Sequence, residues 1–261
     1  MALQCSLRDM KAIILAGGRG TRLAEETLVK PKPLVEAGGH PLIWHIMQNY
    51  SLHGVSEFII LAGYKGHQLK EYFANYWLHQ SDVTFDTSLP SHKILESRSL
   101  PWKVTVLDTG LTTNTGDRIR RAKSLVKETF LLTYGDGVAD VDITSLVEQH
   151  RKESNLLTLT AVQPPARFGA LNLEINKVTS FQEKPVGDGA WVNGGFFVAE
   201  PDIFEFISGE NPSFEIEVLP KLAEKRKLGA YKHVGFWQPV DTIRDLQRLE
   251  EAINRNELPW T

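Results

Sequence analysis

The chain has 261 residues, of which 42% are hydrophobic and 23% charged, and its formal net charge is -3. This composition is that of a soluble globular protein, and the length suits one large domain or two small ones. The charge argues against a nucleic-acid partner, and no apolar run reaches the roughly 18 residues that a membrane span needs.

The N-terminal segment predicts a cytoplasmic protein. The first nine residues lack the apolar core of a signal peptide, and the single cysteine, Cys5, cannot form an internal disulfide. Because Met10 stands directly before the first predicted strand, we expect residues 1–9 to be an optional leader or residues left from cloning.

The stretch from Met10 to Pro33 carries the strongest local pattern. Its short apolar run, Lys11 to Ala16, is typical of a buried strand. The loop that follows reads Gly17, Gly18, Arg19, Gly20, Thr21 and Arg22. Glycines allow close approach of a ligand, and successive N–H groups in such a turn can converge on an anion. Arg22 adds a forked donor, and Lys32 is stiffened between two prolines. We interpret the stretch as a strand that ends in a phosphate-binding loop, with a plain tight turn as the alternative.

Two common phosphate-binding motifs do not fit this loop. The dinucleotide fingerprint requires a third glycine where the chain has Leu23. The P-loop requires Gly-Lys followed by Ser or Thr after four intervening residues, and no such run occurs.

Strands and helices alternate through the first half of the chain. The predicted strands are 33–36, 57–62, 104–108, 129–134 and 156–162, and the predicted helices are 41–52, 66–78, 116–126 and 142–153. Residues 81–102, rich in serine and aspartate, predict an excursion from the sheet, either a hairpin or a mobile flap. The alternation predicts a three-layer, Rossmann-like α/β fold, with a mainly parallel sheet and helices on both faces. Ligands of such sheets bind at the carboxyl ends of strands, so the loop at 17–22 and the turn at 135–137 can share one crevice.

From residue 167 the pattern becomes richer in β-structure. We expect a hairpin over 170–175 and 178–183, strands at 191–198 and 231–238, and helices at 202–207, 214–227 and 242–254. No segment has the composition of a flexible linker. We therefore expect one continuous domain, 10–261, made of one half at 10–165 and a β-rich half at 166–261.

Two aspartates follow predicted strands. Asp136, between two glycines, is either a turn residue or a ligand of Mg²⁺, and Asp241 is either a ligand or the N-cap of the last helix. Their spacing along the chain does not tell whether they meet. No His-x-x-x-His pair or G-x-S-x-G elbow occurs, which argues against a zinc site and a serine hydrolase.

Several motifs together carry a family resemblance. They are LAGGRGTRL at 15–23, PKP at 31–33, TYGDG at 133–137, RFGAL at 167–171, FQEKPVGDGAWVNGGFF at 181–197 and GFWQPVDTIRD at 235–245. In this order they resemble the sugar nucleotidyltransferase family, and within it the glucose-1-phosphate cytidylyltransferases, from Met10 to about Trp260. The leader before Met10 departs from the pattern.

The resemblance implies a role for each matching residue. The nucleotide site would contain Leu15, Ala16, Gly17, Gly18, Arg19, Gly20, Thr21, Arg22, Lys32, Thr113, Arg118 and Gly135. Arg22 and Lys32 would be catalytic, Asp136 and Asp241 would bind Mg²⁺, and Glu183, Lys184 and Asn193 would bind the sugar phosphate.

The implied reaction transfers a cytidylyl group from CTP to α-D-glucose 1-phosphate and gives CDP-glucose and pyrophosphate. Family members form homo-oligomers, and CDP-glucose usually feeds the deoxysugars of surface polysaccharide. Two alternatives stay open: the same reaction with dTTP or UTP, and a catalytically silent subunit that binds a sugar nucleotide.

Overall fold

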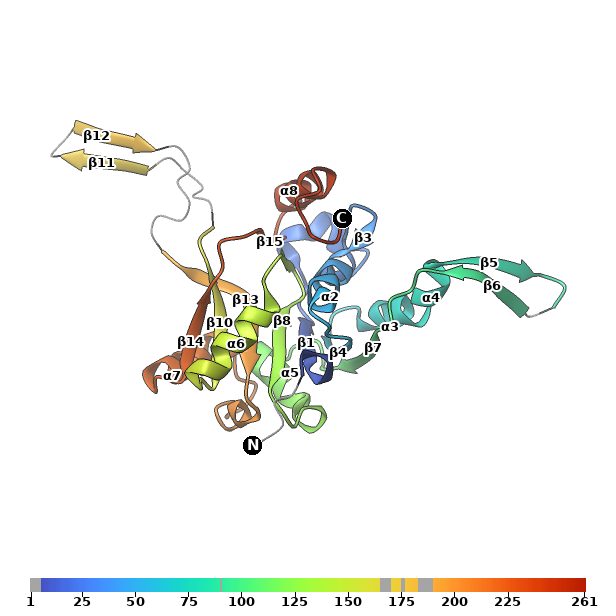
Figure 1. Ribbon diagram of the computed structural model, residues 1–261, viewed down its shortest axis with the longest axis horizontal. Helices are drawn as coiled ribbons and strands as arrows, with labels where there is room; N and C mark the ends of the chain where they lie inside the picture. The colour runs from blue at the N-terminus through green and yellow to red at the C-terminus, as the bar shows by residue number, and fades with distance from the viewer. Residues whose placement is uncertain (1–5, 90, 165–169, 175–176, 183–189) are drawn as a thin grey trace.

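A seven-stranded sheet forms the centre of the molecule (Figure 1). The structure is a computed structural model, and it describes residues 6–89, 91–164, 170–174, 177–182 and 190–261. The strand order is β14-β10-β13-β8-β1-β4-β7. The strands are β1 (Lys11–Ala16), β4 (Glu57–Ala62), β7 (Lys103–Asp108), β8 (Phe130–Tyr134), β10 (Leu157–Val162), β13 (Val192–Ala199) and β14 (Leu228–Lys232). Only β13 runs antiparallel to its neighbours, β8 and β10, which confirms the prediction of a mainly parallel sheet.

Helices cover both faces of this sheet. Alternate residues of β1 point to opposite faces, so Ile14 joins one hydrophobic cluster while Ile13 and Leu15 join the other. The first cluster includes side chains of α2 (Leu42–Leu52), α6 (Ile143–Glu153) and α8 (Ile243–Asn254). The second includes side chains of α5 (Thr115–Arg121) and α7 (Leu219–Glu224). The three-layer prediction is therefore confirmed.

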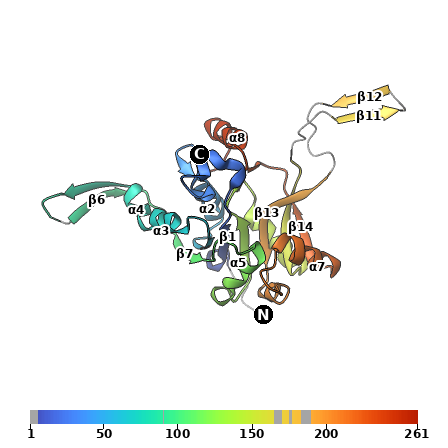
Figure 2. The ribbon, with the colours of Figure 1, turned by 180° about the vertical axis from the view of Figure 1, so that it is seen from behind.

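Shorter elements surround the three layers. Four two-stranded ladders pair β2 (Glu36–Ala37) with β3 (His40–Pro41), β5 (Ser81–Asp86) with β6 (Ser91–Ser97), β9 (Gly137–Ala139) with β15 (Trp237–Pro239), and β11 (Ala170–Glu174) with β12 (Lys177–Gln182). The further helices are α1 (Ala24–Thr27), α3 (Gly66–Ala74) and α4 (Tyr76–His79). Single turns of 3₁₀-helix span Leu7–Asp9, Thr21–Leu23, Lys32–Leu34, Lys123–Leu125 and Pro201–Glu205, and a π-helical turn spans Phe214–Val218. Seen from both sides, the β5–β6 hairpin projects away from the body (Figures 1 and 2).

The excursion predicted at 81–102 is thus a hairpin, and the β11–β12 hairpin was also predicted correctly. Asp142 caps α6 as expected, because its Oδ1 accepts a hydrogen bond of 2.9 Å from the backbone N–H of Ser145. Within the described residues, no helix has both the length and the apolar character needed to cross a membrane.

Some predicted element boundaries were wrong. The strand expected at 33–36 begins instead as the 3₁₀ turn at Lys32–Leu34. The strand expected at 231–238 is broken because it changes partner, from β10 at its start to β9 at its end. Helix α5 ends at Arg121, five residues early. The helix expected at 66–78 breaks at Asn75, whose side chain donates to the carbonyl of Glu71.

Candidate active site

The carboxyl ends of β1 and β8 meet at one edge of the sheet. The two strands are parallel, with Leu15 opposite Tyr134, and the N–H of Gly135 donates to the Leu15 carbonyl at 2.9 Å. A Cβ at Gly135 would lie 2.9 Å from that oxygen and 3.2 Å from Cγ of Pro33. Only glycine therefore lets the two strand ends and the Pro33 segment pack this closely.

The β9–β15 ladder brings the two aspartates together. Asp136 directly precedes β9, and Asp241 follows β15 after one residue. The strands are antiparallel, with Gly137 opposite Pro239, so the start of one lies beside the end of the other. The N–H of Val240 also donates to the Asp136 carbonyl at 2.9 Å. The two carboxylates consequently enter the same space from different halves of the chain.

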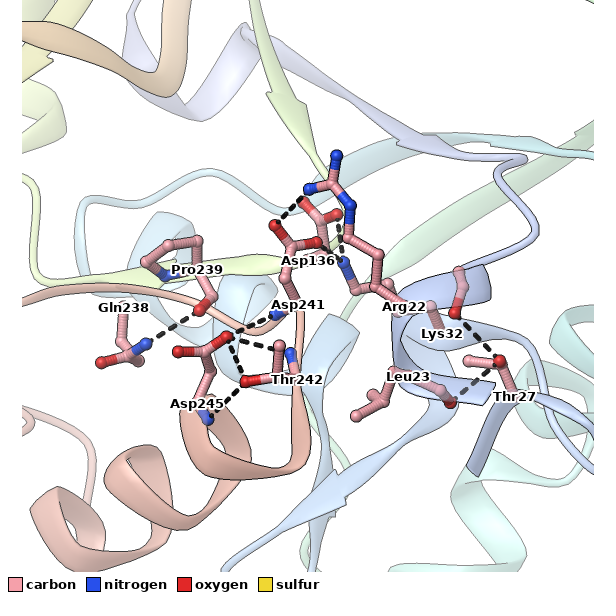
Figure 3. Close-up of polar contacts among 11 residues, drawn as sticks. Arg22, Leu23, Thr27, Lys32, Asp136, Gln238, Pro239, Asp241, Thr242 and Asp245 are labelled. Atoms are coloured by element: carbon pink, nitrogen blue, oxygen red, sulfur yellow. Dashed lines mark hydrogen bonds and ion pairs between the residues drawn. The ribbon is translucent and has the colours of Figure 1, made fainter. Parts of the chain in front are cut away.

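Lys32 lies between these carboxylates (Figure 3). Its Nζ is 2.7 Å from Oδ2 of Asp136 and 2.7 Å from Oδ1 of Asp241. Lys32 is 7% exposed, whereas the side chains of Asp136 and Asp241 are 40% and 41% exposed, so the lysine lies beneath the carboxylates. The exposed Arg22 reaches the same group, with Nη1 at 3.2 Å from Oδ2 of Asp241. The structure thus brings the two residues predicted to be catalytic together with the two predicted to bind Mg²⁺.

Charge neutralisation within this cluster shifts two pKa values. Burial opposes the positive charge of Lys32, but the charges and hydrogen bonds of the two aspartates outweigh it and raise the pKa of the ammonium group. Burial also opposes ionisation of Asp241, yet the hydrogen bond and charge of Lys32, with those of Arg22, hold the pKa of this carboxyl below its ordinary value. Both shifts favour the charged forms of Lys32 and Asp241 at neutral pH.

Asp241 does not cap the last helix. The N-cap of α8 is Thr242, which forms a capping box with Asp245. This leaves the Asp241 carboxylate turned toward Lys32 and excludes the N-cap interpretation of this residue (Figure 3).

A cavity of about 230 Å³, the first cavity, lies over this cluster. It is lined by Leu15, Ala16, Gly18, Gly20, Thr21, Arg22, Lys32, Pro33, Gly135, Asp136 and Asp241. Gly20 has a φ of +61°, and a Cβ there would lie 3.1 Å from Cβ of Lys32. The glycine loop therefore packs against the stem of the lysine and lines the same cavity as the two aspartates.

A second cavity, of about 490 Å³, shares Leu15, Gly18 and Asp136 with the first. Its other lining residues are Gly17, Arg19, Leu111, Thr112, Thr113, Asn114, Thr115, Arg118, Tyr134, Ser213 and Glu215. Because the two cavities have a common wall, they form one continuous site. All twelve residues predicted for the nucleotide line one or both of them.

Arg118 forms the floor of the loop as well as part of the second cavity. It is 5% exposed, and its guanidinium donates to the carbonyls of Gly110 (2.8 Å), Ala62 (3.3 Å) and Gly17 (3.3 Å). It also donates to Oγ1 of Thr109. Burial lowers the pKa of this guanidinium. Arg118 therefore fixes the glycine loop to the ends of β4 and β7 from below.

The residues predicted for the sugar phosphate are only partly described. Asn193, in β13, donates from Nδ2 to the hydroxyl of Tyr134 at 3.3 Å and so adjoins the second cavity. Glu183 and Lys184 lie outside the described residues.

The donor set of the first cavity fits Mg²⁺. This ion is usually held by one or two carboxylates together with substrate phosphates, and it keeps several waters. Asp136 and Asp241 supply two carboxylates that already share one cation, the Lys32 ammonium. Within the described part of the chain, no group of three or more His, Cys, Asp or Glu side chains could hold a metal alone, so substrate oxygens would have to complete the coordination.

Sequence reasoning missed several residues of the second cavity, among them Tyr134 and Glu215. The hydroxyl of Tyr134 donates to Oε1 of Glu215 at 2.8 Å, and both side chains line the cavity. Tyr134 lies within the TYGDG motif, but Glu215 follows a loop and stands outside every motif. Only the packing of the π-helical turn against α5 brings Glu215 to the site.

Comparison with known proteins agrees with this arrangement. Residues 11–256 match the model of the family described as nucleotidyl transferase. The chain belongs to the nucleotidyl transferase family. A glucose-1-phosphate cytidylyltransferase of Salmonella typhi is 53% identical over 253 residues, which cover 96% of this chain and 98% of that protein. A probable glucose-1-phosphate cytidylyltransferase of Bacillus subtilis is 42% identical over 96% of this chain and 99% of its own length.

Solved structures of other proteins share the fold. HddC from Yersinia pseudotuberculosis, complexed with GMP-PN, superposes with a TM-score of 0.68 at 21% identity and covers 94% of this chain and 99% of that one. A UDP-glucose pyrophosphorylase superposes with a TM-score of 0.67 at 17% identity, covering 95% and 99%.

Proposed function

We propose that this chain is a glucose-1-phosphate cytidylyltransferase, which makes CDP-glucose and pyrophosphate from CTP and α-D-glucose 1-phosphate. The main structural support is Lys32, held 2.7 Å from both Asp136 and Asp241 beside a glycine-rich loop. The nearly full-length similarity to named cytidylyltransferases supports the choice of substrates. A nucleoside triphosphate substrate fits a cytoplasmic enzyme.

In this reaction a phosphate oxygen of glucose 1-phosphate attacks the α-phosphorus of CTP, a P–O bond forms, and the bond to pyrophosphate breaks. The attacking phosphate is already ionised at neutral pH, so no strong general base is needed. Catalysis then depends on holding two polyanions in line and stabilising their charge. Mg²⁺, when held by Asp136 and Asp241, would neutralise phosphate charge.

Different residues of the chain would bind the different phosphate groups. Residues 18 and 20–22 of the loop line the first cavity, and successive backbone N–H groups of such a turn can bind phosphate oxygens. Arg22 and Lys32 place two cations at the same end of the cavity, where they would bind the leaving pyrophosphate. We assign the nucleotide to the half at 10–165, and the sugar phosphate to the half at 166–261, with Asn193 and the undescribed Glu183 and Lys184.

Pyrophosphate release tests the substrates directly. The enzyme is assayed with glucose 1-phosphate, Mg²⁺ and each of CTP, dTTP, UTP and ATP in turn. We expect CTP to give the highest kcat/KM, and CTP no better than dTTP or UTP would contradict the proposal.

The variant Asp136→Asn tests whether the chain is an active enzyme or a catalytically silent binding subunit. The substitution keeps the size of the side chain but removes the charge that faces Lys32. We expect turnover to be abolished while circular dichroism and the melting temperature stay close to those of the wild type. Wild-type turnover by this variant would remove Asp136 from the metal site.

We also propose that the chain forms homo-oligomers through the β5–β6 hairpin. This hairpin projects from the body and exposes large apolar side chains, among them Phe85 (58% exposed) and Leu95 (62% exposed). Such a surface is usually covered by another protein chain. Light scattering after size-exclusion chromatography should give a multiple of 29.4 kDa for the wild type and a smaller mass for Phe85→Ser/Leu95→Ser. A monomeric wild type would contradict this assignment.

A further inference from the structure

Glu215 is a carboxylate in the wall of the second cavity that none of the sequence motifs contains. It lies on the π-helical turn Phe214–Val218, next to Ser213. Such turns are rare and frequently occur at functional sites. The cavity that Glu215 faces also contains Gly18 and Asp136, which belong to the site described above.

Three hydroxyl groups hold the Glu215 carboxylate. Oε2 accepts hydrogen bonds from Oγ1 of Thr115 at 2.5 Å and from Oγ of Ser213 at 3.1 Å. Oε1 accepts one, from the hydroxyl of Tyr134 at 2.8 Å. An ionised carboxylate has about four acceptor positions, two on each oxygen. Among the described residues, Oε2 is therefore saturated, whereas Oε1 accepts a single hydrogen bond and retains one acceptor position for a ligand.

Oε1, the oxygen with the open acceptor position, is connected to Asn193 through the Tyr134 hydroxyl. The Nδ2 of Asn193 donates to the Tyr134 hydroxyl at 3.3 Å, and its Oδ1 accepts from the N–H of Gly195 at 2.9 Å. Gly195 has a φ of +87°, and a Cβ there would lie 2.7 Å from the ring of Tyr134. These contacts fix the tyrosine ring and point its hydroxyl at Oε1. The saturated Oε2 lies instead beside Thr115, close in sequence to the nucleotide residue Thr113.

The charges around Glu215 favour an uncharged hydrogen-bond donor as the ligand group at Oε1. Among the described residues, no lysine, arginine or histidine forms an ion pair with Glu215. A carboxylate without a cation repels phosphate oxygens and attracts O–H or N–H groups. Burial, together with the charge and hydrogen bond of Glu215, raises the pKa of Tyr134, which keeps this residue a donor.

We propose that Glu215 is a specificity-determining residue whose Oε1 accepts a hydrogen bond from a ring hydroxyl group of glucose 1-phosphate. This inference rests on the proposed function and adds to it a contact for the sugar. The hydrogen bonds that connect Oε1 through Tyr134 to Asn193, which we assign to the sugar phosphate, favour the sugar over the cytosine amine, and the charge of Glu215 excludes the phosphates.

Glu215→Gln tests this contact with a side chain of the same shape. KM and kcat are measured for both substrates, with Glu217→Gln, at an exposed position on the same turn, as the matched control. A hydrogen bond to a charged group corresponds to roughly a 10- to 100-fold effect. We expect a loss of that order in kcat/KM for glucose 1-phosphate, carried by KM, while KM for CTP changes less than about twofold. The control should behave as the wild type.

The 2-, 3-, 4- and 6-deoxy analogues of glucose 1-phosphate identify the hydroxyl group. With the analogue that lacks the bound hydroxyl, wild type and Glu215→Gln should have equal kcat/KM within experimental error, because neither can form the bond. Glu215→Asp, which retains the charge but shortens the reach, should show the same pattern and replaces Glu215→Gln if that variant does not fold.

Two outcomes would overturn the inference. A variant that loses the same factor with every analogue would make Glu215 structural. A raised KM for CTP with a changed CTP-to-UTP preference would place the cytosine amine at Oε1. Failure of the proposed function is distinct, since the wild type itself would then form no CDP-glucose.

Discussion

Lys32 Nζ lies 2.7 Å from Asp241 Oδ1, although 209 residues separate the two in the chain. Asp136 lies at the same distance from this nitrogen. The ammonium group is thus the cation that both carboxylates share. If these carboxylates bind Mg²⁺, the metal and Lys32 compete for them, and binding of the metal frees the lysine for a phosphate.

Lys32→Met should therefore strengthen metal binding when no nucleotide is present. Removing a unit charge a few ångströms from the metal is worth at least about 1.4 kcal/mol, which is tenfold in affinity. Titration of the free enzyme with Mn²⁺, followed by electron paramagnetic resonance, would measure this. Lys30→Met, which removes a peripheral ion pair with Glu36 at 3.0 Å, is the control. Equal or weaker Mn²⁺ binding by Lys32→Met would refute the competition.

Gly17→Ala and Gly18→Ala should differ in stability although they are neighbours. A Cβ at Gly17 would collide with the guanidinium of Arg118, whereas a Cβ at Gly18 would meet no atom within 4 Å. We expect Gly17→Ala to lower the free energy of unfolding by about 1–3 kcal/mol and Gly18→Ala to change it by less than about 0.5 kcal/mol. Urea denaturation followed by circular dichroism provides the measurement. Equal stabilities of the two variants would show that the Arg118 guanidinium can move to make room for a Cβ at residue 17.

Arg118→Lys should lower both stability and nucleotide affinity. A lysine cannot reproduce the fork that now reaches Gly17, Ala62 and Gly110, so buried carbonyls would lose their partner. We expect a loss of about 2–4 kcal/mol in the free energy of unfolding and a raised KM for CTP. Arg121→Lys, at a half-exposed position, is the control. Unchanged stability with a raised KM would mean that Arg118 acts on the nucleotide alone.

The sequence predicted the layers of the fold because the β-strands and helices have clear periodicities. It also predicted the glycine loop and both aspartates, since they stand in motifs directly after strands. It could not predict that the aspartates meet, because this depends on the short β9–β15 ladder between distant segments. The strand expected at 231–238 failed for the same reason, since its two ends pair with different strands.

Glu215 escaped sequence analysis altogether. Its neighbourhood suggested an ordinary helix from 214 to 227, and helical periodicity carries no information about a π-helical turn at the start. The turn presents Glu215 to Tyr134 only because Thr115 and Ser213 hold its other oxygen. Such a site depends on tertiary contacts among four residues that have no fixed spacing.

His45 connects the C-terminal residues to the segment that follows Lys32. Trp260 Nε1 donates to His45 Nδ1 at 3.0 Å, and an indole N–H can only donate. The proton of the neutral imidazole is therefore on Nε2, which donates to the carbonyl of Ala37 at 2.9 Å. Burial lowers the pKa of His45 to about 4, and the nearby His40 adds to this effect. The folded protein thus keeps His45 neutral where the unfolded chain would protonate it.

The sign of the resulting pH dependence follows from proton binding. Between pH 6.5 and about 4, the unfolded chain binds more protons at His45 than the folded protein does, so stability falls as the pH falls. From pH 7 to 4.5 this site should remove roughly 2–3 kcal/mol from the free energy of unfolding. Because His45→Gln cannot titrate at this position, its free energy of unfolding should fall by roughly 2–3 kcal/mol less than that of the wild type over the same pH range. His67→Gln, at an exposed position, is the control, and its free energy of unfolding should fall as much as that of the wild type. Urea denaturation at both pH values, monitored by tryptophan fluorescence, measures the difference. Parallel losses in wild type and His45→Gln would show that protonation of His45 does not destabilise the fold.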